Sequence, residues 1–372
     1  MKTEKIEKFI IDYFDGQQPL DFVSALFDDV RAKNRTEILA SLLVSSLYTE
    51  NREMSDKIFE KIKYTQLPCG GFDEKFYGLE DENVGSYGAI TTSFIAISCT
   101  SYIEKYYKSS TEHSDWLIKL ADYIYSKESN GYFLKGTLNR SKALNTDLFM
   151  AYALSKITKK LHKQSIRRRM FEECIKRTLF RVISYQFING SFPYQSYTFK
   201  VPFIYHIVVT SIMKYFALDL NNKVVINAYY KGVKYIEKNI YNGNLILWEN
   251  ANDPDKQGAT WAYSFLLNIF SSKHSFHDSI ISNIDKTRDC GLFKTTLDSK
   301  KSQVDKFYSS WIMISLDMYD DAQPVIYGRH TSIYLLFIRQ IHNITAITRY
   351  IGQKIQNIFF DTGAHENKDP HD

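Results

Sequence analysis

Residues that could transfer protons or bind polar groups stand at the starts of strongly apolar segments. Those with acid–base chemistry are Asp147, Asp305, Tyr205 and His206. Tyrosine and histidine side chains serve as general acids or bases, and a carboxylic acid can protonate a substrate when its pKa suits the task. Aromatic and polar side chains at comparable places could bind a substrate, and they are Tyr87, Trp248, Glu249, Gln257, Trp261 and Tyr308. We treat these residues as candidates for a catalytic and binding site.

These candidates also have structural explanations, which the sequence leaves open. Aspartate is a preferred helix N-cap, so Asp147 and Asp305 could serve only to start helices. His206 lies in the apolar run Val201–Thr210. A histidine there is commonly a hydrogen-bonded core residue, because burial makes its charged form costly. Tyr205 and His206 diverge by about 100° on a helix, so they cannot both reach one substrate atom without distortion.

Two polar stretches have open interpretations. Glu249 is followed by the pair Asp253-Pro254, which favours a turn. Glu249 could therefore be an acid, part of a cation site, or a solvated side chain. The segment Lys156–Arg169 carries seven positive residues and no acid. Such a run suits an anionic membrane surface or a diphosphate, but it is also typical of a solvated loop and the start of an exposed helix.

The elements that would position the candidates follow a repeat marked by glycine. Short glycine signals recur at Gly71, Gly131, Gly190, Gly243 and Gly291, at intervals of 60, 59, 53 and 48 residues. Glycine adopts a left-handed backbone conformation without Cβ strain, so these positions suit the C-caps of helices.

Two kinds of helical segment lie between the glycine signals. The apolar kind, typical of a buried inner helix, covers residues 90–103, 144–157, 203–218, 259–269 and 307–318. The amphipathic kind, typical of an outer helix, covers residues 116–125, 166–185, 224–240 and 276–284. An earlier pair spans 36–49 and 54–64, and a last helix begins near Val325. About six such pairs predict an all-α (α/α)6 toroid, and a solenoid is the other architecture that the repeat allows.

This repeat implies one domain over residues 1–360. We expect N-terminal helices within 1–35, the repeats over 36–330, an amphipathic helix over 331–360 and a polar tail over 361–372. The C-terminal amphipathic pattern suits either an interfacial membrane anchor or packing across the outside of the ring, which we favour.

Two turns carry a family resemblance. Gln66 to Phe72 and Gln186 to Phe192 fit the Gln-x3-Gly-x-Trp signal of squalene-cyclase-type repeats, with Phe in place of Trp. The chain therefore resembles the terpenoid cyclase and protein prenyltransferase toroid superfamily. That resemblance implies an isoprenoid substrate. The family's Asp-x-Asp-Asp acid is absent, and Asp147 is the one aspartate at a comparable place.

The prenyltransferase zinc ligands are also missing. The segments Thr260–Phe265 and Asp305–Trp311 resemble the two zinc segments of that family. Thr260 and Ala262 stand where the first ligands would be, and Ser309 stands near the histidine position. These side chains cannot build a tetrahedral nitrogen and sulfur site. We expect neither zinc nor any other cofactor.

Composition and charge exclude several classes of protein. A chain of 372 residues with 44% hydrophobic residues is neither disordered nor fibrous. Its net charge of +5 is too small for a nucleic-acid footprint. The four cysteines are far apart, and the N-terminus lacks the apolar core of a signal peptide. We expect a cytoplasmic protein, and we leave peripheral membrane contact and oligomeric state open.

Three functions remain open, each with a small-molecule or lipid partner. The first, which the resemblance implies, is proton-initiated cyclisation of a polyprenyl substrate, with an acid such as Asp147 and aromatic faces that stabilise a carbocation. The second is carbohydrate processing of a lyase or epimerase kind, with Tyr205, His206, Trp248 and Glu249 as the candidates. The third is a non-catalytic binding or scaffold protein whose ring is filled by side chains.

Overall fold

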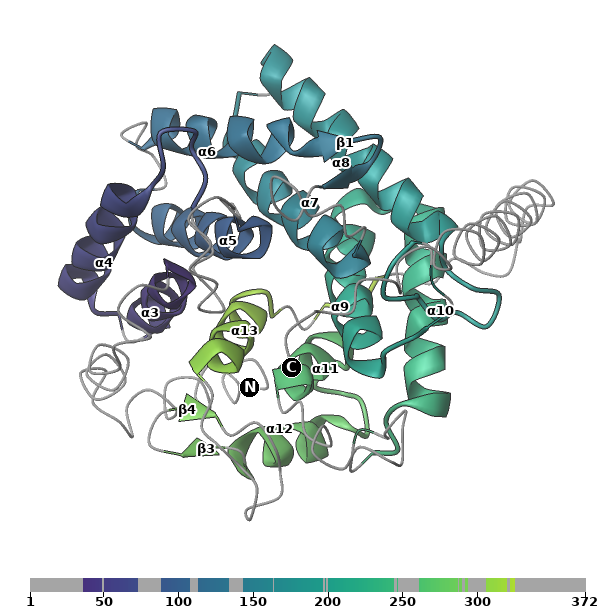
Figure 1. Ribbon diagram of the computed structural model, residues 1–372. Coiled ribbons are helices and arrows are strands. Elements are labelled where there is room, and N and C mark those ends of the chain that lie inside the picture. The colour runs from purple at the N-terminus through teal and green to yellow at the C-terminus, as the bar shows by residue number, and fades with distance from the viewer. Residues whose placement is uncertain are drawn as a thin grey trace, which may run out of the picture.

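Alternating apolar and amphipathic segments form alternating inner and outer helices (Figure 1). The inner helices are α3 (Thr36–Tyr48), α5 (Ala89–Tyr106), α7 (Leu144–Thr158), α9 (Phe203–Leu220), α11 (Trp261–Ile269) and α13 (Lys306–Asp317). The outer helices are α4 (Arg52–Thr65), α6 (Ser114–Ser126), α8 (Ile166–Ser184), α10 (Lys223–Asn239) and α12 (His277–Lys286). An apolar segment needs cover on all sides, and α7 is buried along nearly its whole length. The amphipathic α10 buries one stripe of residues.

The computed structural model describes residues 36–48, 50–72, 88–107, 113–133, 143–162, 164–196, 198, 200–243, 246, 261–286, 288–289, 292–293, 306–319 and 322–324. The helices predicted within residues 1–35, the last helix near Val325, the amphipathic helix over 331–360 and the tail over 361–372 lie outside these residues.

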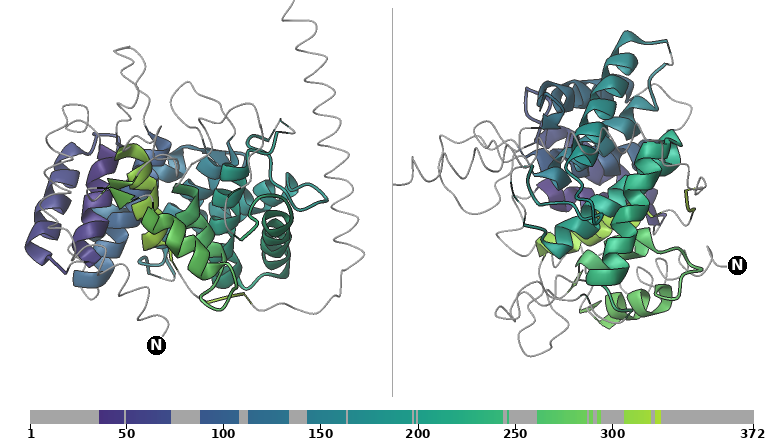
Figure 2. Two further views of the ribbon diagram at one scale, coloured as in Figure 1. Left: turned by 90° about the horizontal axis from the view of Figure 1, so that it is seen from below. Right: turned by 90° about the vertical axis from the view of Figure 1, so that its right-hand side faces the viewer.

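The inner helices close into a ring. Each packs against the next along the chain, and α13 packs back against α3. The Tyr48 hydroxyl of α3 donates to the Leu316 carbonyl oxygen of α13 at 3.2 Å. Figure 2 shows the same closure from two further sides, with the yellow-green α13 beside the purple α3. The predicted (α/α)6 toroid is therefore confirmed, and the solenoid alternative is excluded.

Contacts between the inner helices fix their direction. Phe94 is the sixth residue of α5 and Phe149 the sixth of α7, and their ring centroids lie 5.2 Å apart. Trp311, the sixth residue of α13, lies 5.3 Å from both.

Further along, Ser101 of α5, Lys156 of α7 and Asp317 of α13 also meet, at the thirteenth, thirteenth and twelfth residues of their helices. Because each residue advances a helix by about 1.5 Å, two contacts at matching counts mean that these three helices run the same way with level ends. We call the end where these helices begin the N-terminal end of the ring.

The Gln-x3-Gly segments form a tight turn between an outer helix and the next inner helix. After α8, the Gly190 N–H donates to the Phe187 carbonyl oxygen at 2.9 Å, and Gly190 has a φ of 94°. The Gln186 side chain donates to the Gly190 carbonyl oxygen at 2.9 Å. A Cβ on Gly190 would lie 2.3 Å from the Lys231 carbonyl oxygen, so both conformation and space require glycine. Phe192 then enters the core.

The turn after α4 corrects the glycine assignment. Gly70, rather than Gly71, has the positive φ of 97°, and the Gln66 side chain donates to its carbonyl oxygen at 2.8 Å. The first interval between the glycine signals is therefore counted from Gly70 instead of Gly71. The glycine also does not cap the helix, because α4 ends at Thr65 and the Gln66 N–H already bonds the Lys63 carbonyl oxygen. It shapes the turn that follows.

Asn130 and Gly131 make a different turn. They join β1 (Glu128–Ser129) to β2 (Tyr132–Phe133) as a hairpin, and both have positive φ, 53° and 83°. Asn-Gly favours this two-residue turn, whose twist matches that of paired strands. The helix C-cap predicted at Gly131 is therefore wrong. The strands β3 (Arg288–Asp289) and β4 (Leu292–Phe293) form a second short antiparallel pair.

Helix α9 is long and apolar enough to cross a membrane by length and composition alone. In the ring it packs between α7 and α11 and against the outer helix α10, and 61% of its apolar window is buried. Its hydropathy is accounted for by its place as an inner helix.

Candidate functional site

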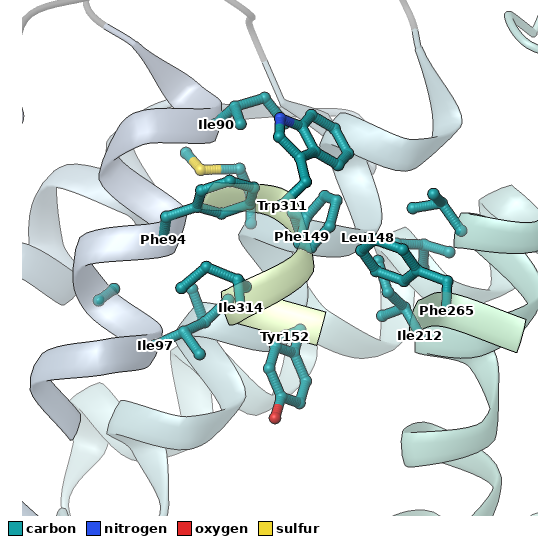
Figure 3. Close-up of a cluster of buried hydrophobic side chains, with 14 of the residues drawn as sticks. Ile90, Phe94, Ile97, Leu148, Phe149, Tyr152, Ile212, Phe265, Trp311 and Ile314 are labelled. Carbon is teal, nitrogen blue, oxygen red and sulfur yellow. The ribbon is translucent and has the colours of Figure 1, made fainter. Parts of the chain in front are cut away.

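A layer of aromatic side chains fills the N-terminal half of the ring interior (Figure 3). Phe94, Phe149 and Trp311 meet at centroid distances of 5.2–5.3 Å. Phe265 of α11 completes the layer, 6.2 Å from Phe149 and 6.3 Å from Trp311. All four side chains are buried, so four inner helices are packed together at this level. We call this set the aromatic layer.

A second layer lies one helical turn nearer the N-terminal end. A residue four positions earlier on a helix occupies the same face, and its side chain leans toward the helix start. Ile90 therefore stands above Phe94, Asn145 above Phe149 and Trp261 above Phe265, and all three are buried. The Trp261 ring lies 5.0 Å from Trp311, so the two layers are in contact.

Three aromatic rings form an arc beside this second layer. Tyr194, in the segment before α9, packs on Tyr205 with centroids 4.5 Å apart and planes tilted by 36°. Tyr205 meets Trp261 edge to face at 6.2 Å. The Leu144 N–H donates to the Tyr194 carbonyl oxygen at 3.1 Å, which ties the arc to the start of α7. Both tyrosines are half-buried, so the arc borders the surface at the N-terminal end of the ring.

Asp147 faces the outer wall of the ring. One carboxylate oxygen accepts the Phe133 N–H at 2.6 Å, and the other pairs with the Arg181 guanidinium of α8. Arg181 also donates to the Gly131 carbonyl oxygen, and the Asp147 side chain is wholly buried. The carboxylate therefore holds the hairpin turn and an outer helix against the start of α7.

His206, like Asp147, is buried and bonds main-chain groups of the segments around the start of its helix. Its Nδ1 accepts the Phe192 N–H at 3.0 Å, so the ring proton lies on Nε2, which donates to the Gly232 carbonyl oxygen at 3.2 Å. Burial lowers the pKa of His206 to about 4, against the opposing effect of the bond to Gly232. The imidazole is neutral at pH 7. It points away from Tyr205, as adjacent positions on a helix require.

Three successive repeats share this hydrogen bond. In each, the N–H of the buried phenylalanine after the turn donates to a side chain near the start of the next inner helix. The pairs are Phe72 with Thr92, Phe133 with Asp147 and Phe192 with His206, at 3.2, 2.6 and 3.0 Å. The repeat thus explains why a polar residue stands at each position. A role for Asp147 or His206 in proton transfer stays a prediction.

The side chains of the remaining candidates lie outside the residues that the structure describes. Tyr87, Trp248, Glu249, Gln257 and Asp305 lie outside those residues. Tyr308 lies in α13, but its side chain is outside the description. The structure therefore places two of the candidates in one arc: Tyr205, predicted as an acid–base residue, and Trp261, predicted to bind substrate. Within the described residues, no group of three or more His, Cys, Asp or Glu side chains could hold a metal ion.

The C-terminal half of the interior contains a largely buried ion pair beside aromatic side chains such as Tyr152 and Tyr215, whose ring centroids lie 4.4 Å apart. Lys156 of α7 donates to the Ser101 hydroxyl of α5 at 2.6 Å and lies 3.5 Å from the Asp317 carboxylate of α13. Ser101 donates to the same carboxylate at 2.8 Å. The nearby Tyr152 hydroxyl points away from the aromatic layer (Figure 3), and burial raises the pKa of Tyr152 well above its usual value. We call Ser101, Lys156 and Asp317 the polar clasp.

The basic run from the end of α7 into α8 is largely paired with acids, four of them on neighbouring helices and one, Glu172, on α8 itself. The pairs are Lys156 with Asp317, Lys159 with Asp219, Lys160 with Glu104, Arg167 with Asp122 and Arg168 with Glu172. This pairing offsets most of the charge that would attract an anionic surface. Peripheral membrane contact stays a prediction.

Sequence reasoning missed several residues of this region. Tyr194 lies two positions after the buried Phe192 of the turn, and this spacing is the one signal that could have located it. Arg181 looked like one more charge on an outer helix. Its bond to Asp147 joins residues 34 positions apart, which no local pattern reveals.

Comparisons with known proteins agree with the fold. No protein-family model matches the chain, and no curated protein matches its sequence. Its structure is similar to a heparin-specific unsaturated glucuronyl hydrolase at 10% identity, with a TM-score of 0.55 over 77% of this chain and 85% of that one. It is similar to a D-mannose isomerase at 9% identity, with a TM-score of 0.53 over 76% and 85%.

A third similar structure is a type II terpene cyclase from Scytonema in complex with merosterolic acid A. It is 11% identical, with a TM-score of 0.53 over 83% of this chain and 97% of that one. The structural likenesses are mostly to carbohydrate-active enzymes. At these identities they establish the all-α toroid fold, which hosts unrelated reactions.

Proposed function

We propose that the protein is a carbohydrate-processing toroid enzyme that binds a sugar at the N-terminal end of the ring. The observation that carries the proposal is the arc of Tyr194, Tyr205 and Trp261. Aromatic rings with polar edges suit a pyranose, because the ring faces pack on C–H groups while the phenol and indole groups hydrogen-bond to hydroxyls. The fold likeness to a glucuronyl hydrolase and a mannose isomerase is consistent with this choice.

The filled interior supports a sugar over a polyprenyl chain, and it also agrees with the scaffold alternative, which the turnover experiment below tells apart from an enzyme. The aromatic layer lies directly beneath Trp261, and its residues are buried. A long isoprenoid would need apolar space at that depth, whereas a sugar can lie above the layer. Asp147, the acid of the cyclisation hypothesis, is already paired with Arg181 and bonded by the Phe133 N–H. Both of its carboxylate oxygens are thus engaged, so a substrate would have to displace one of these bonds in order to be protonated.

The reaction that we propose is proton transfer of a lyase or epimerase kind. Tyr205 is half-buried beside Trp261 at the end of the ring where we place the sugar, whereas His206 is buried and bonds main-chain groups through both ring nitrogens. The Tyr205 oxygen would take the proton from the carbon next to a carbonyl or carboxylate group, and the electrons of the broken C–H bond would form an enolate. In an epimerase the enolate takes a proton back on its other face, and in a lyase it expels the oxygen substituent of the β carbon and leaves a C=C bond. Trp248 and Glu249 remain further candidates. We place this reaction in the cytoplasm.

Binding is tested with the full chain and a panel of D-glucose, D-mannose, D-glucuronate, cellobiose and maltotriose. We expect at least one sugar to change the tryptophan fluorescence, and Trp261→Leu and Tyr205→Ala each to weaken binding about tenfold or more. The control is Tyr64→Ala, which removes an exposed tyrosine from outer helix α4 and should leave affinity unchanged. Binding of squalene or farnesyl diphosphate with no sugar bound would favour the isoprenoid function instead.

Turnover is tested by following solvent deuterium into D-mannose and cellobiose by NMR, and by following the new double bond of an eliminated uronate in the ultraviolet. We expect Tyr205→Phe to abolish turnover and to leave sugar affinity nearly unchanged, because it removes one hydroxyl and keeps the ring. Sugar binding without turnover in the wild-type protein would favour a binding or scaffold role.

A further inference from the structure

Asn145 has an unusual position within the repeat. It is the second residue of α7, it is 5% exposed, and it stands one turn above Phe149 on the face that meets the aromatic layer. Figure 3 shows Phe149 pointing toward Trp311 in this part of the interior. The Asn145 amide therefore lies in the second layer, next to the start of the arc that Leu144 ties to Tyr194.

The repeat does not require a polar residue there. The residue two positions before each turn acceptor is Ile90 in α5, Asn145 in α7 and Ile204 in α9. Two of these three equivalent positions are apolar. The turn itself is served by Asp147, which accepts the Phe133 N–H. Among these three repeats, a polar side chain at this position is therefore found in the third repeat alone.

The amide oxygen is left without a protein donor. Asn145 Oδ1 is buried and has no hydrogen-bond partner within the described part of the chain. A buried carbonyl oxygen without a donor destabilises the fold, so a position with no structural need for it calls for another explanation. The side chains that share the second layer with it, Ile90 and Trp261, carry no charge, so a neutral donor such as a hydroxyl suits this oxygen more than a cation does.

We infer that Asn145 Oδ1 accepts a hydrogen bond from one hydroxyl of the bound sugar and thereby sets which sugar the site prefers. This inference rests on the proposed function, since it assigns a specificity-determining residue to the same site. A site that reads a hydroxyl discriminates against an analogue that lacks it, because the protein acceptor is then left unpaired.

The test replaces Asn145 with the residue of the neighbouring repeats. Asn145→Ile should weaken binding of the best sugar of the panel about tenfold, the size of one lost hydrogen bond, while it leaves the urea midpoint unchanged or raised. The matched control is Ser211→Ala, which removes from inner helix α9 a buried hydroxyl that likewise has no hydrogen-bond partner among the residues that the structure describes. This control should leave sugar affinity unchanged.

Deoxy analogues of the same sugar identify the hydroxyl. One analogue should bind the wild-type protein about tenfold more weakly than the parent sugar and bind Asn145→Ile as well as the parent does. Equal affinity of the wild-type protein and Asn145→Ile for every sugar overturns this inference and leaves the proposed function standing. Failure of the wild-type protein to bind any sugar overturns both.

Discussion

Different interactions hold the helices together at the two ends of the ring interior. At the N-terminal end, Phe94, Phe149, Phe265 and Trp311 meet as a buried aromatic layer. At the C-terminal end, the polar clasp joins Ser101, Lys156 and Asp317 from three inner helices. Aromatic burial stabilises without regard to charge, whereas an ion pair must offset the loss of hydration of both partners.

The two ends differ in what they contribute: packing stability at the N-terminal end and alignment of the helices at the C-terminal end. The aromatic layer packs four helices by area and shape, so each ring that it loses leaves a cavity. The polar clasp adds little net stability, but it is satisfied only when α5, α7 and α13 sit at one relative height. We therefore infer that the N-terminal end supplies most of the cohesion and the C-terminal end sets the register.

The largest effect should follow a cavity in the aromatic layer. Phe149→Ala should lower the free energy of unfolding by about 3–5 kcal/mol, because the wholly buried ring contacts three other aromatic side chains. Urea unfolding followed by circular dichroism measures this loss. Phe149→Leu should lose much less, and an alanine variant as stable as the wild-type protein would contradict the role given to the layer.

A smaller effect should follow a broken clasp. Asp317→Asn should cost about 2 kcal/mol, because it leaves the Lys156 ammonium, which is 12% exposed, without its counter-charge. The double variant Lys156→Met/Asp317→Leu should recover to within about 1 kcal/mol of the wild-type protein. Urea unfolding of all three chains provides the comparison. Additive losses in the double variant would show that the clasp is a net source of stability.

Acidification should act on the N-terminal end through His206. Its pKa falls from 6.5 to about 4 on folding, so between these values the unfolded chain binds the extra proton. The stability linked to His206 is fully present above pH 6.5 and is lost as the pH falls toward 4, by about 2 kcal/mol at pH 4.5.

Urea unfolding at pH 7 and pH 4.5 measures this loss. The control is His206→Gln, whose side-chain oxygen can still accept the Phe192 N–H but does not titrate over this range. The variant should lose about 2 kcal/mol less than the wild-type protein between the two pH values. Equal losses would show that His206 is not the group responsible.

The smallest effect should come from the rim of the C-terminal end. Lys159 pairs with Asp219 at 2.5 Å, but the lysine side chain is 44% exposed. Lys159→Ala should change the free energy of unfolding by at most about 0.5 kcal/mol, because water screens exposed pairs. Comparing its urea midpoint with that of Asp317→Asn separates exposed from buried pairing. A loss as large as that of Asp317→Asn would contradict this distinction.

The sequence was sufficient for the fold because the fold depends on local patterns. An apolar segment such as residues 144–157 predicts an inner helix, and α7 spans Leu144–Thr158. The Gln-x3-Gly spacing at Gln186 likewise marks a real turn. The Asn130-Gly131 hairpin was mistaken for a helix cap, because both structures favour glycine with a positive φ.

The candidate site was less predictable, because it depends on contacts between repeats. Whether Phe149 meets Trp311 depends on the relative height of two helices that are 162 residues apart in the chain, and periodicity within one helix does not contain that information. Asp147 stood out as a carboxylate near a helix start. Its bonds to Phe133 and Arg181 emerge only when the hairpin and α8 are placed around it.

Closure of the ring also governs when this protein can fold. Tyr48 and Leu316 meet across 268 residues of sequence. During synthesis α3 leaves the ribosome long before α13, so the part of α3 that packs against α13 lacks its final cover until α13 has emerged. Contacts between such distant segments form slowly. The nascent chain therefore passes through an open, aggregation-prone arc, and a chain cut before Lys306 would remain in that state.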